Sequence, residues 1–367
     1  MPYADSTDVE RLQRPGYEEI VRVADAGTGL RAVIAVHDTT LGPALGGTRF
    51  QPYPDDDRAL ADVLRLARGM TYKSALAGLD VGGGKAVIVG NPRRDKSPAL
   101  LEAYGRFVDG LGGRYVTAPD VGTDEDDMVV VRRATRHVTG LPRQHGGLGD
   151  PSPVTARGLR HGLRGVQRWL TGWADLGGLH VVVLGAGKVG GALVGLLLDE
   201  GCRVTVADVD GERAAAFGVA VADPATAHTI ECDVFSPCAL GGILDPVHIA
   251  GLRCRAVVGA ANNQLSGPGS AELLAERGIL YAPDYAVNAG GIMSVAEELA
   301  AGRRAVTGQP AGASLARVAE RVASIEETIM AVLDRSRADG VTTAAAADAL
   351  AEARLARAGS PRGAAAG

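Results

Sequence analysis

Residues 180–198 read HVVVLGAGKVGGALVGLLL and contain the pattern G-x-G-x-x-G at 185–190. The apolar run before the pattern predicts a buried strand, and the apolar residues after it predict a helix. In such a unit Gly185 makes the tight turn, Gly187 lets the backbone approach a pyrophosphate, and Gly190 lets the helix pack on the strand. The helix N-terminus offers free N–H groups and the positive end of its dipole. We therefore expect a dinucleotide cofactor to bind along Gly185, Ala186, Gly187, Lys188, Val189 and Gly190.

Asp208 ends the next predicted strand, eighteen residues after Gly190. A carboxylate at this position accepts both hydroxyls of the adenosine ribose, and its negative charge repels a 2′-phosphate. Asp208 therefore favours NAD over NADP. Arg213 is close enough in the sequence to weaken that preference.

The composition excludes several classes of function. The 367-residue chain is 46% hydrophobic and 22% charged with a net charge of −5, which is typical of a globular protein long enough for two domains. Because no basic cluster stands out and aromatic residues make up only 4%, we expect no nucleic-acid partner. The N-terminus, MPYADSTDVERLQRPG, lacks a signal-peptide pattern, so we expect a cytoplasmic protein with no membrane partner. The four cysteines lack zinc spacing, so no metal site is expected.

The order of predicted elements indicates an α/β fold with two domains. From residue 180 onward, short Val- and Ala-rich strands alternate with helices, which predicts a parallel, doubly wound sheet. We expect an N-terminal α/β substrate and oligomerisation domain (1–145, with a C-terminal helix at about 335–357) and a Rossmann dinucleotide-binding domain (146–334). The Gly- and Pro-rich stretch 140–153 is interpreted as a hinge, and 358–367 as a disordered tail.

Two lysines stand beside a glycine run, Lys73 in RGMTYKSAL and Lys85 in GLDVGGGKAVIVG. Apolar residues at 60, 63, 64 and 67 predict a helix that continues through Lys73, and the apolar run after Lys85 predicts a buried strand that begins there. If helix packs on strand, the lysine with less solvent and no counter-ion should lose its proton and act as a base. The other can stay charged and bind a carboxylate. The glycines would let a substrate lie close to the backbone.

Asp120, in YVTAPDVGTDEDD, follows a predicted strand and precedes an acidic turn. The sequence leaves two interpretations of this residue open. It is a candidate for handling a proton beside the lysines, or it is the N-cap of a segment that begins at Val121.

A series of motifs between about residues 39 and 300 resembles one enzyme family. The motifs are TTLGPALGGTRF, RGMTYKSALAGLDVGGGKAVIVG, RYVTAPDVGT, GDPSPVTARG, VVVLGAGKVGG, SPCALGGIL, GAANNQL and APDYAVNAGG. The chain resembles the amino-acid dehydrogenases that act on leucine, valine, phenylalanine and glutamate, and most of all the branched-chain members. The resemblance implies oxidative deamination of an L-amino acid by NAD to a 2-oxo acid and ammonia. It also implies that Lys73 binds the substrate α-carboxylate, Lys85 is the catalytic base and Asp120 its proton partner, in a homo-oligomer.

The resemblance extends to other positions. Thr155 and Asn262 correspond to contacts near the nicotinamide and the reacting carbon, and Asn288 lines the same cleft. Arg49 either reaches the cofactor or forms a structural salt bridge. Cys238 and Ala239 match a loop that passes the cofactor, with backbone contacts expected.

The resemblance also implies an uncharged side-chain pocket. Its residues are Leu45, Gly46, Met70, Gly82, Ala118, Thr139, Ile292 and Val295. Because a glutamate side chain would be left unpaired there, branched aliphatic substrates fit best. An aromatic substrate, phenylalanine or tryptophan, and a non-catalytic NAD-binding homologue are the alternatives. Pro119 and Arg157 depart from the residues usual in the family.

Overall fold

The computed structural model describes residues 7–306 and 312–360 and divides the chain into two compact units. Unit 1 takes Met1–Asp150, Ser294–Leu315 and Glu352–Gly367, and unit 2 takes Pro151–Met293 and Ala316–Ala351. We expected a helix at about 335–357 to belong to the N-terminal domain. In the structure only the residues from Glu352 onward belong to unit 1, whereas Ala316–Ala351 belong to unit 2. The tail expected from residue 358 is helical through Gly359, and 361–367 lie outside the described residues.

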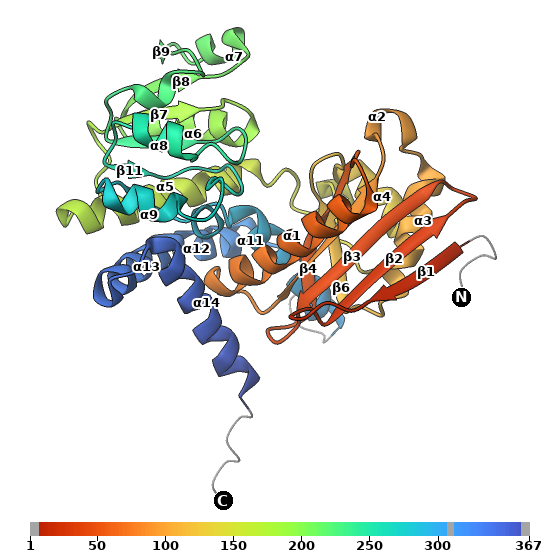
Figure 1. The fold of residues 1–367 in the computed structure, drawn as a ribbon. Coiled ribbons are helices and arrows are strands. Elements are labelled where there is room, and N and C mark those ends of the chain that lie inside the picture. Colours follow the sequence, from red (N-terminus) through yellow and green to blue (C-terminus); the bar gives the residue numbers. More distant parts are fainter. Residues whose placement is uncertain (1–6, 307–311, 361–367) are drawn as a thin grey trace, which may run out of the picture. The chain divides into compact units, whose positions relative to one another are not determined.

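Unit 1 contains a mixed six-stranded sheet (Figure 1). Its spatial order is β1 (Thr7–Leu12), β2 (Glu19–Asp25), β3 (Leu30–Asp38), β5 (Gly82–Val89), β4 (Ala44–Gln51) and β6 (Tyr115–Pro119). The pairs β1–β2, β2–β3 and β3–β5 are antiparallel, and β4 runs parallel to both β5 and β6. This order places β4 between the strand that carries Lys85 and the strand that Asp120 follows.

Helices cover both faces of this sheet. Helix α1 (Asp56–Leu76) begins at the N-cap Asp55 and buries Ala59, Leu60, Val63 and Ala67 against β3 and β5. This confirms the helix predicted from the apolar spacing and its continuation through Lys73. On the other face α3 (Pro98–Asp109) and α4 (Glu125–Arg132) pack Tyr104, Phe107 and Met128 into a second core. The short elements α2 (Pro92–Asp95) and η1 (Arg143–His145) complete the connections.

Unit 2 is a parallel, doubly wound sheet, as predicted. Its spatial order is β12 (Leu280–Tyr281), β11 (Ala256–Val257), β10 (Val234–Pro237), β7 (His180–Leu184), β8 (Arg203–Ala207) and β9 (Ala220–Val221). Every strand pair is parallel, and β7 is buried throughout. The first helices of this unit are α5 (Ser152–Thr171), α6 (Lys188–Asp199), α7 (Gly211–Ala215), η2 (Ala227–Thr229), α8 (Pro246–Gly251), α9 (Ser270–Glu276) and α10 (Asp284–Val287).

The remaining helices follow in the last part of the chain. They are α11 (Gly290–Val306), α12 (Leu315–Ala323), α13 (Ile325–Asp339) and α14 (Thr343–Gly359). The boundary between the units falls inside both α11 and α14. Across 7–306 and 312–360, no helix has the length and apolar character needed to cross a membrane.

Candidate active site

Lys85 and Asp120 form an ion pair across β4. Lys85 Nζ lies 2.7 Å from Asp120 Oδ2. Lys85 is on β5 and only 6% exposed, and Asp120 is the residue directly after β6. The two residues come from neighbouring elements of one sheet although they are far apart in the sequence. The lysine and the aspartate singled out in the sequence are therefore brought together.

Two glycines of β4 permit this approach. A Cβ built on Gly46 would lie 1.8 Å from the carbonyl oxygen of Gly84, so β4 comes close to β5 there. A Cβ built on Gly47 would lie 2.6 Å from the carbonyl oxygen of Pro119 and 2.8 Å from Cβ of Asp120. Because Gly47 has no side chain, the Asp120 side chain can reach over β4.

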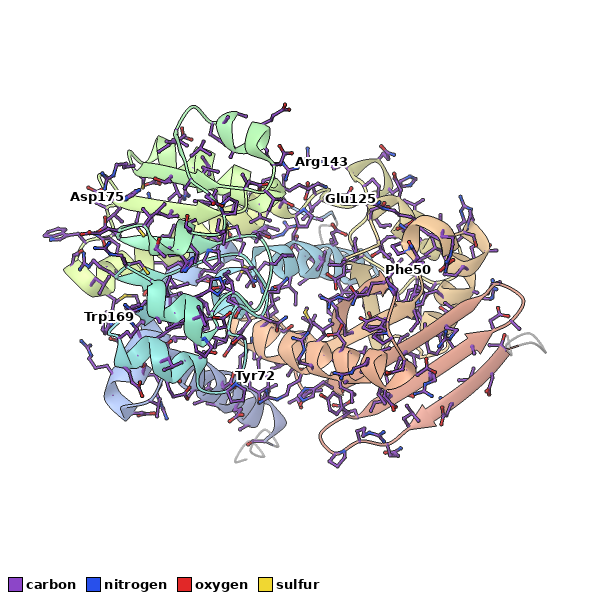
Figure 2. All side chains as sticks on the ribbon, turned by 45° about the horizontal axis from the view of Figure 1, so that its top comes forward. Phe50, Tyr72, Glu125, Arg143, Trp169 and Asp175 are labelled. Atoms are coloured by element: carbon purple, nitrogen blue, oxygen red, sulfur yellow. The ribbon has the colours of Figure 1, made fainter. Side chains whose placement is uncertain are left out.

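The turn after β6 fixes the backbone of Asp120. Its N–H donates to the Thr123 hydroxyl at 2.9 Å, and that hydroxyl donates to the backbone carbonyl of Thr48 on β4 at 2.8 Å. Gly122 has φ of +82°, and a Cβ there would lie 1.9 Å from the Phe50 carbonyl oxygen, so a side chain would not fit. The D-V-G-T motif therefore forms a turn that packs on β4 and is hydrogen-bonded to it. Figure 2 labels Phe50, the β4 residue against which Gly122 packs.

The N-cap interpretation of Asp120 is wrong. Helix α4 begins at Glu125, and its N-cap is Asp124, whose side chain accepts from the Asp127 N–H. The Asp127 side chain accepts in return from the Asp124 N–H. Asp120 therefore lies outside this capping box, and its carboxylate faces cations.

Arg49 provides the second cation. Its Nε lies 3.4 Å from Asp120 Oδ2, and another guanidinium nitrogen donates to Asp62 Oδ2 at 3.0 Å. The Tyr53 hydroxyl donates to the same Asp62 oxygen at 2.7 Å. Arg49 and Asp62 are each only 15% exposed, so solvent screens this network little. Of the two interpretations of Arg49, the salt bridge is observed, and a cofactor contact stays a prediction.

Electrostatics keep Asp120 ionised. Burial would raise its pKa, but the adjacent Lys85 ammonium and Arg49 guanidinium outweigh burial and lower the pKa to about 2. The sequence argument required that the less exposed lysine have no counter-ion. The structure corrects this point, because the buried lysine is the one paired with Asp120.

Lys73 lies on the last turn of α1, half-buried. This turn packs directly on the start of β5. A Cβ on Gly83 would lie 2.1 Å from the backbone nitrogen of Thr71, and the Ser74 hydroxyl donates to the Gly82 carbonyl at 3.4 Å. The predicted packing of the lysine-bearing helix on the lysine-bearing strand is thus confirmed.

The glycine run has a different use from the one expected. Strand β5 begins at Gly82, three residues before Lys85, so the glycines lie inside the strand. A Cβ on Gly82 would meet the carbonyl oxygens of Asp38 and Gly42, and a Cβ on Gly84 would meet the Tyr115 ring. Atoms of the protein itself therefore occupy the side-chain positions of these glycines, and a substrate contact along this run stays a prediction.

The residues expected in the side-chain pocket are uncharged but fall in both units. Leu45 is fully buried, and Ala118 and Thr139 are 5% and 2% exposed. Thr139 Oγ1 is buried and has no hydrogen-bond partner among the described residues. Those in unit 1 are Leu45, Gly46, Met70, Gly82, Ala118, Thr139 and Val295. Ile292 is buried in unit 2.

In unit 2 the glycine fingerprint has the geometry expected for it. Gly185 has φ of +98°, and a Cβ on Gly190 would lie 1.9 Å from the Gly185 carbonyl oxygen, so neither tolerates a side chain. Gly187 is the N-cap of α6 and has open space where its Cβ would be. No side-chain hydrogen bond caps this helix, which is the arrangement that suits a phosphate at a helix N-terminus.

Asp208 directly follows β8 and holds the fingerprint turn. Its carboxylate accepts from the backbone N–H groups of Ala186 at 2.6 Å and Asp210 at 2.8 Å. Burial raises its pKa, but these bonds and the charge of Arg213, 3.5 Å away, lower the pKa overall. Arg213 is also paired with Asp210 at 2.9 Å. A carboxylate at this place suits ribose hydroxyls.

Cys238 and Ala239 follow β10 and pack beside the fingerprint. Ala239 lies against Gly185, and Cβ of Cys238 lies 3.1 Å from a Cβ built on Gly190. Burial raises the pKa of the Cys238 thiol, which suits a structural residue better than a reactive one.

The amide and hydroxyl residues expected near the nicotinamide also lie in unit 2. Asn288 donates to Asn262 Oδ1 at 2.8 Å and to the Ala260 carbonyl at 3.0 Å. Thr155, near the start of α5, donates to the Pro151 carbonyl at 3.1 Å. Asn262 and Asn288 are therefore neighbours, and Thr155 is held by its own helix.

Four residues of these sites were not anticipated: Gly47, Tyr53, Asp62 and Thr123. Asp62 lies on α1 outside the apolar positions 60, 63, 64 and 67, so the helix pattern gave no indication of its partners. Gly47 is the second of a glycine pair, and Thr123 ends the D-V-G-T motif. Tyr53 carries no comparable local pattern.

Comparison with known proteins agrees with this arrangement. Residues 18–137 match the dimerisation domain of Glu/Leu/Phe/Val dehydrogenases, and residues 215–363 match the Glutamate/Leucine/Phenylalanine/Valine dehydrogenase domain. Valine dehydrogenase of Streptomyces virginiae is 49% identical over 347 residues, covering 93% of this chain and 94% of that protein. Leucine dehydrogenase of Bacillus cereus is 44% identical over 351 residues, covering 95% and 93%.

A solved structure gives the same result. L-tryptophan dehydrogenase from Nostoc punctiforme has a TM-score of 0.80 with 38% identity and covers 94% of this chain and 97% of that chain. The similarity extends over both units. The chain belongs to the Glu/Leu/Phe/Val dehydrogenase family of amino-acid dehydrogenases.

Proposed function

We propose that this protein catalyses the NAD-dependent oxidative deamination of a branched-chain L-amino acid. The L-amino acid, NAD⁺ and water are converted to the 2-oxo acid, ammonium, NADH and one proton. The observation that carries the proposal is the buried Lys85–Asp120 pair in a chain nearly half identical to valine and leucine dehydrogenases. The other steps follow from the chemistry of the residues around that pair.

The residues around the fingerprint fit NAD. The uncapped N-terminus of α6 would bind the pyrophosphate, Gly187 leaves it room, and Asp208 would accept the ribose hydroxyls. When bound, NAD⁺ supplies the acceptor for the hydride that leaves the substrate α-carbon. NAD is preferred to NADP because Asp208 is ionised and Arg213, which could attract a 2′-phosphate, is already paired with Asp208 and Asp210.

Lys73 and Lys85 divide the work on the substrate. Lys73 binds the α-carboxylate as an ammonium ion. After hydride departure the substrate is an iminium ion, and Lys85 as a free amine removes a proton from the water that adds to its carbon. The same proton then passes from Lys85 to the nitrogen. The C–N bond breaks and ammonia leaves, while the Lys85 amine takes the hydroxyl proton as the carbonyl forms.

Asp120 stabilises the protonated form of Lys85 in a buried site. Because the pKa of Asp120 is about 2, it acts as a fixed negative charge more readily than as a store for the proton. Arg49 shares this charge, which weakens the hold of Asp120 on the Lys85 ammonium and lets the amine be released. Asp120 thus orients the base, and Arg49 limits the strength of the pair.

The pocket composition supports an aliphatic substrate. Leu45 and Ala118 are buried and apolar, and no charged residue is among those expected to line the pocket. A glutamate side chain would leave a carboxylate unpaired there, at a cost of several kcal/mol. We further propose a homo-oligomer, supported by the match of residues 18–137 to a dimerisation domain.

A substrate panel tests the proposal. The purified protein is given L-valine, L-leucine, L-isoleucine, L-phenylalanine, L-tryptophan or L-glutamate with NAD⁺ or NADP⁺, and NADH or NADPH absorbance is followed. The expected result is highest kcat/KM for a branched-chain amino acid with NAD⁺, and loss of this activity in Lys85→Ala. Preference for an aromatic amino acid would replace the substrate assignment, and NAD binding without turnover on any substrate would overturn the enzymatic one.

A further inference from the structure

The C-terminal half of α14 forms hydrogen bonds with the turn of α1 that carries Lys73. The Tyr72 hydroxyl donates to Glu352 at 2.8 Å, and Arg68 lies over the Tyr72 ring (Figure 2 marks Tyr72). Arg354 donates to two backbone carbonyls of α1, those of Ser74 at 3.2 Å and Ala75 at 2.9 Å. These contacts involve the residues directly before and after Lys73.

The Arg354 bonds are more than surface contacts. Both bonds come from one guanidinium nitrogen. The same two carbonyls also accept from the backbone N–H groups of Leu79 at 3.0 Å and Gly78 at 3.2 Å, so Arg354 adds a second donor to each. Arg354 is also paired with Asp80 at 3.0 Å, but the Asp80 side chain is 91% exposed, so this pair contributes little. The bonds to the α1 carbonyls are therefore the part of the interaction that holds the helix end.

The opposite side of the same turn lies on β5. Thr71 packs on Gly83, and the Ser74 hydroxyl contacts the Gly82 carbonyl. The backbone of Lys73 is thus held from one side by the strand that carries Lys85 and from the other by Glu352 and Arg354. If the contact with α14 is lost, this turn can shift while β5 and the Lys85–Asp120 pair stay in place.

We propose that Glu352 and Arg354 are positioning residues that fix the Lys73 ammonium for the substrate α-carboxylate. This inference rests on the carboxylate-binding role proposed for Lys73. It predicts that a residue about 280 positions away in the sequence controls substrate affinity without touching substrate or cofactor.

The test compares Arg354→Met, Arg354→Lys and the control Arg357→Met, which alters an exposed arginine on the same helix. For Arg354→Met we expect the KM for the best amino acid of the panel, and the Ki of a branched saturated monocarboxylate, to rise about tenfold. Arg354→Lys should recover part of that loss. The Kd of NADH, which binds unit 2, and all constants of Arg357→Met should stay within about twofold. An equal loss of NADH affinity would overturn the proposal.

A double-mutant cycle shows whether Arg354 acts through Lys73. If it does, Arg354→Met should add almost nothing to KM in a Lys73→Ala background, whereas an independent effect would be additive and would refute the inference. If Lys73→Ala itself leaves KM unchanged, the proposed role of Lys73 fails first. If Arg354→Met does not fold, Glu352→Ala removes the acceptor of the Tyr72 hydroxyl, while Tyr72 keeps the bond that it accepts from Arg68 at 2.9 Å. This variant should raise KM by a smaller factor; an unchanged KM there would also count against the proposal.

Discussion

Replacing Asp120 with asparagine should remove a charge that both stabilises unit 1 and sets the state of Lys85. The change keeps the size of the side chain but leaves the Lys85 ammonium and the Arg49 guanidinium, both largely buried, without their shared counter-ion. Lowering the pKa of Asp120 from 3.8 to about 2 corresponds to about 2 kcal/mol of favourable interaction with the ionised carboxylate. We therefore expect Asp120→Asn to lose about 2 kcal/mol of unfolding free energy at neutral pH.

The stabilisation by Asp120 should depend on pH in a defined direction. Because the pKa of Asp120 is lower in the folded protein than in the unfolded chain, its stabilisation is complete above about pH 5 and is lost as the pH falls toward 2. Urea unfolding followed by circular dichroism from about pH 2.5 to 8 measures the difference between wild type and variant. The difference should be constant above about pH 5 and shrink below it. Asp8→Asn, which alters an exposed residue of β1, serves as the control and should change nothing.

The same variant should alter catalysis in two ways. Turnover should fall about 10²-fold or more, because the base has lost its orienting partner. The alkaline rise of kcat/KM should move to lower pH, since Lys85 no longer has a carboxylate that favours its protonated form. Unchanged stability at neutral pH, together with an unchanged pH profile, would refute the electrostatic account of the pair.

Three further substitutions test neighbouring contacts. Arg49→Met should move the alkaline rise of kcat/KM to higher pH, because Asp120 then acts on Lys85 alone; a shift to lower pH would contradict this. Gly47→Val places a Cβ 2.6 Å from the Pro119 carbonyl oxygen, so kcat should fall about 10²-fold while the Kd of NADH, measured by fluorescence, stays constant. Asp208→Asn should lower the ratio of kcat/KM with NAD⁺ to that with NADP⁺ about tenfold, and a constant ratio would remove Asp208 from cofactor selection.

The dinucleotide fold could be predicted because its determinants are local. The strand, the glycine turn and the helix of residues 180–199 are consecutive, and Asp208 follows the next strand at the expected place. The packing of α1 on β5 was also predictable, because the apolar spacing of α1 defines a buried face. In both cases neighbouring residues in the sequence carry the information.

The contacts around Asp120 could not be predicted in the same way. They depend on the strand order β5-β4-β6, which lets Arg49 of β4 pair with both Asp120 and Asp62. Nothing in the local sequence specifies that order. The N-cap was ambiguous because several acidic residues follow one another, and Asp124 takes the position through its reciprocal bonds with Asp127.

The glycine run and the C-terminal helices show a similar limit. The absence of a side chain at residues 82–84 suits a ligand as well as a tightly packed neighbour, and the tight packing against Thr71 of α1 and Tyr115 of β6 could not be deduced from the sequence alone. The Ala-rich helices after residue 311 have no local feature that shows which unit they join. Residues 352–360 belong to unit 1 because Glu352 and Arg354 bind α1.

The most direct measurement is the pH dependence of kcat/KM for L-valine in wild type and Lys85→Ala. If a neutral amine at position 85 takes the proton from water, the wild-type value rises about tenfold per pH unit from neutral pH until the amine is free. In Lys85→Ala this rise should vanish, and the rate should fall by a factor of about 10³ or more. A variant that keeps the wild-type rise or most of its rate would show that another group is the base.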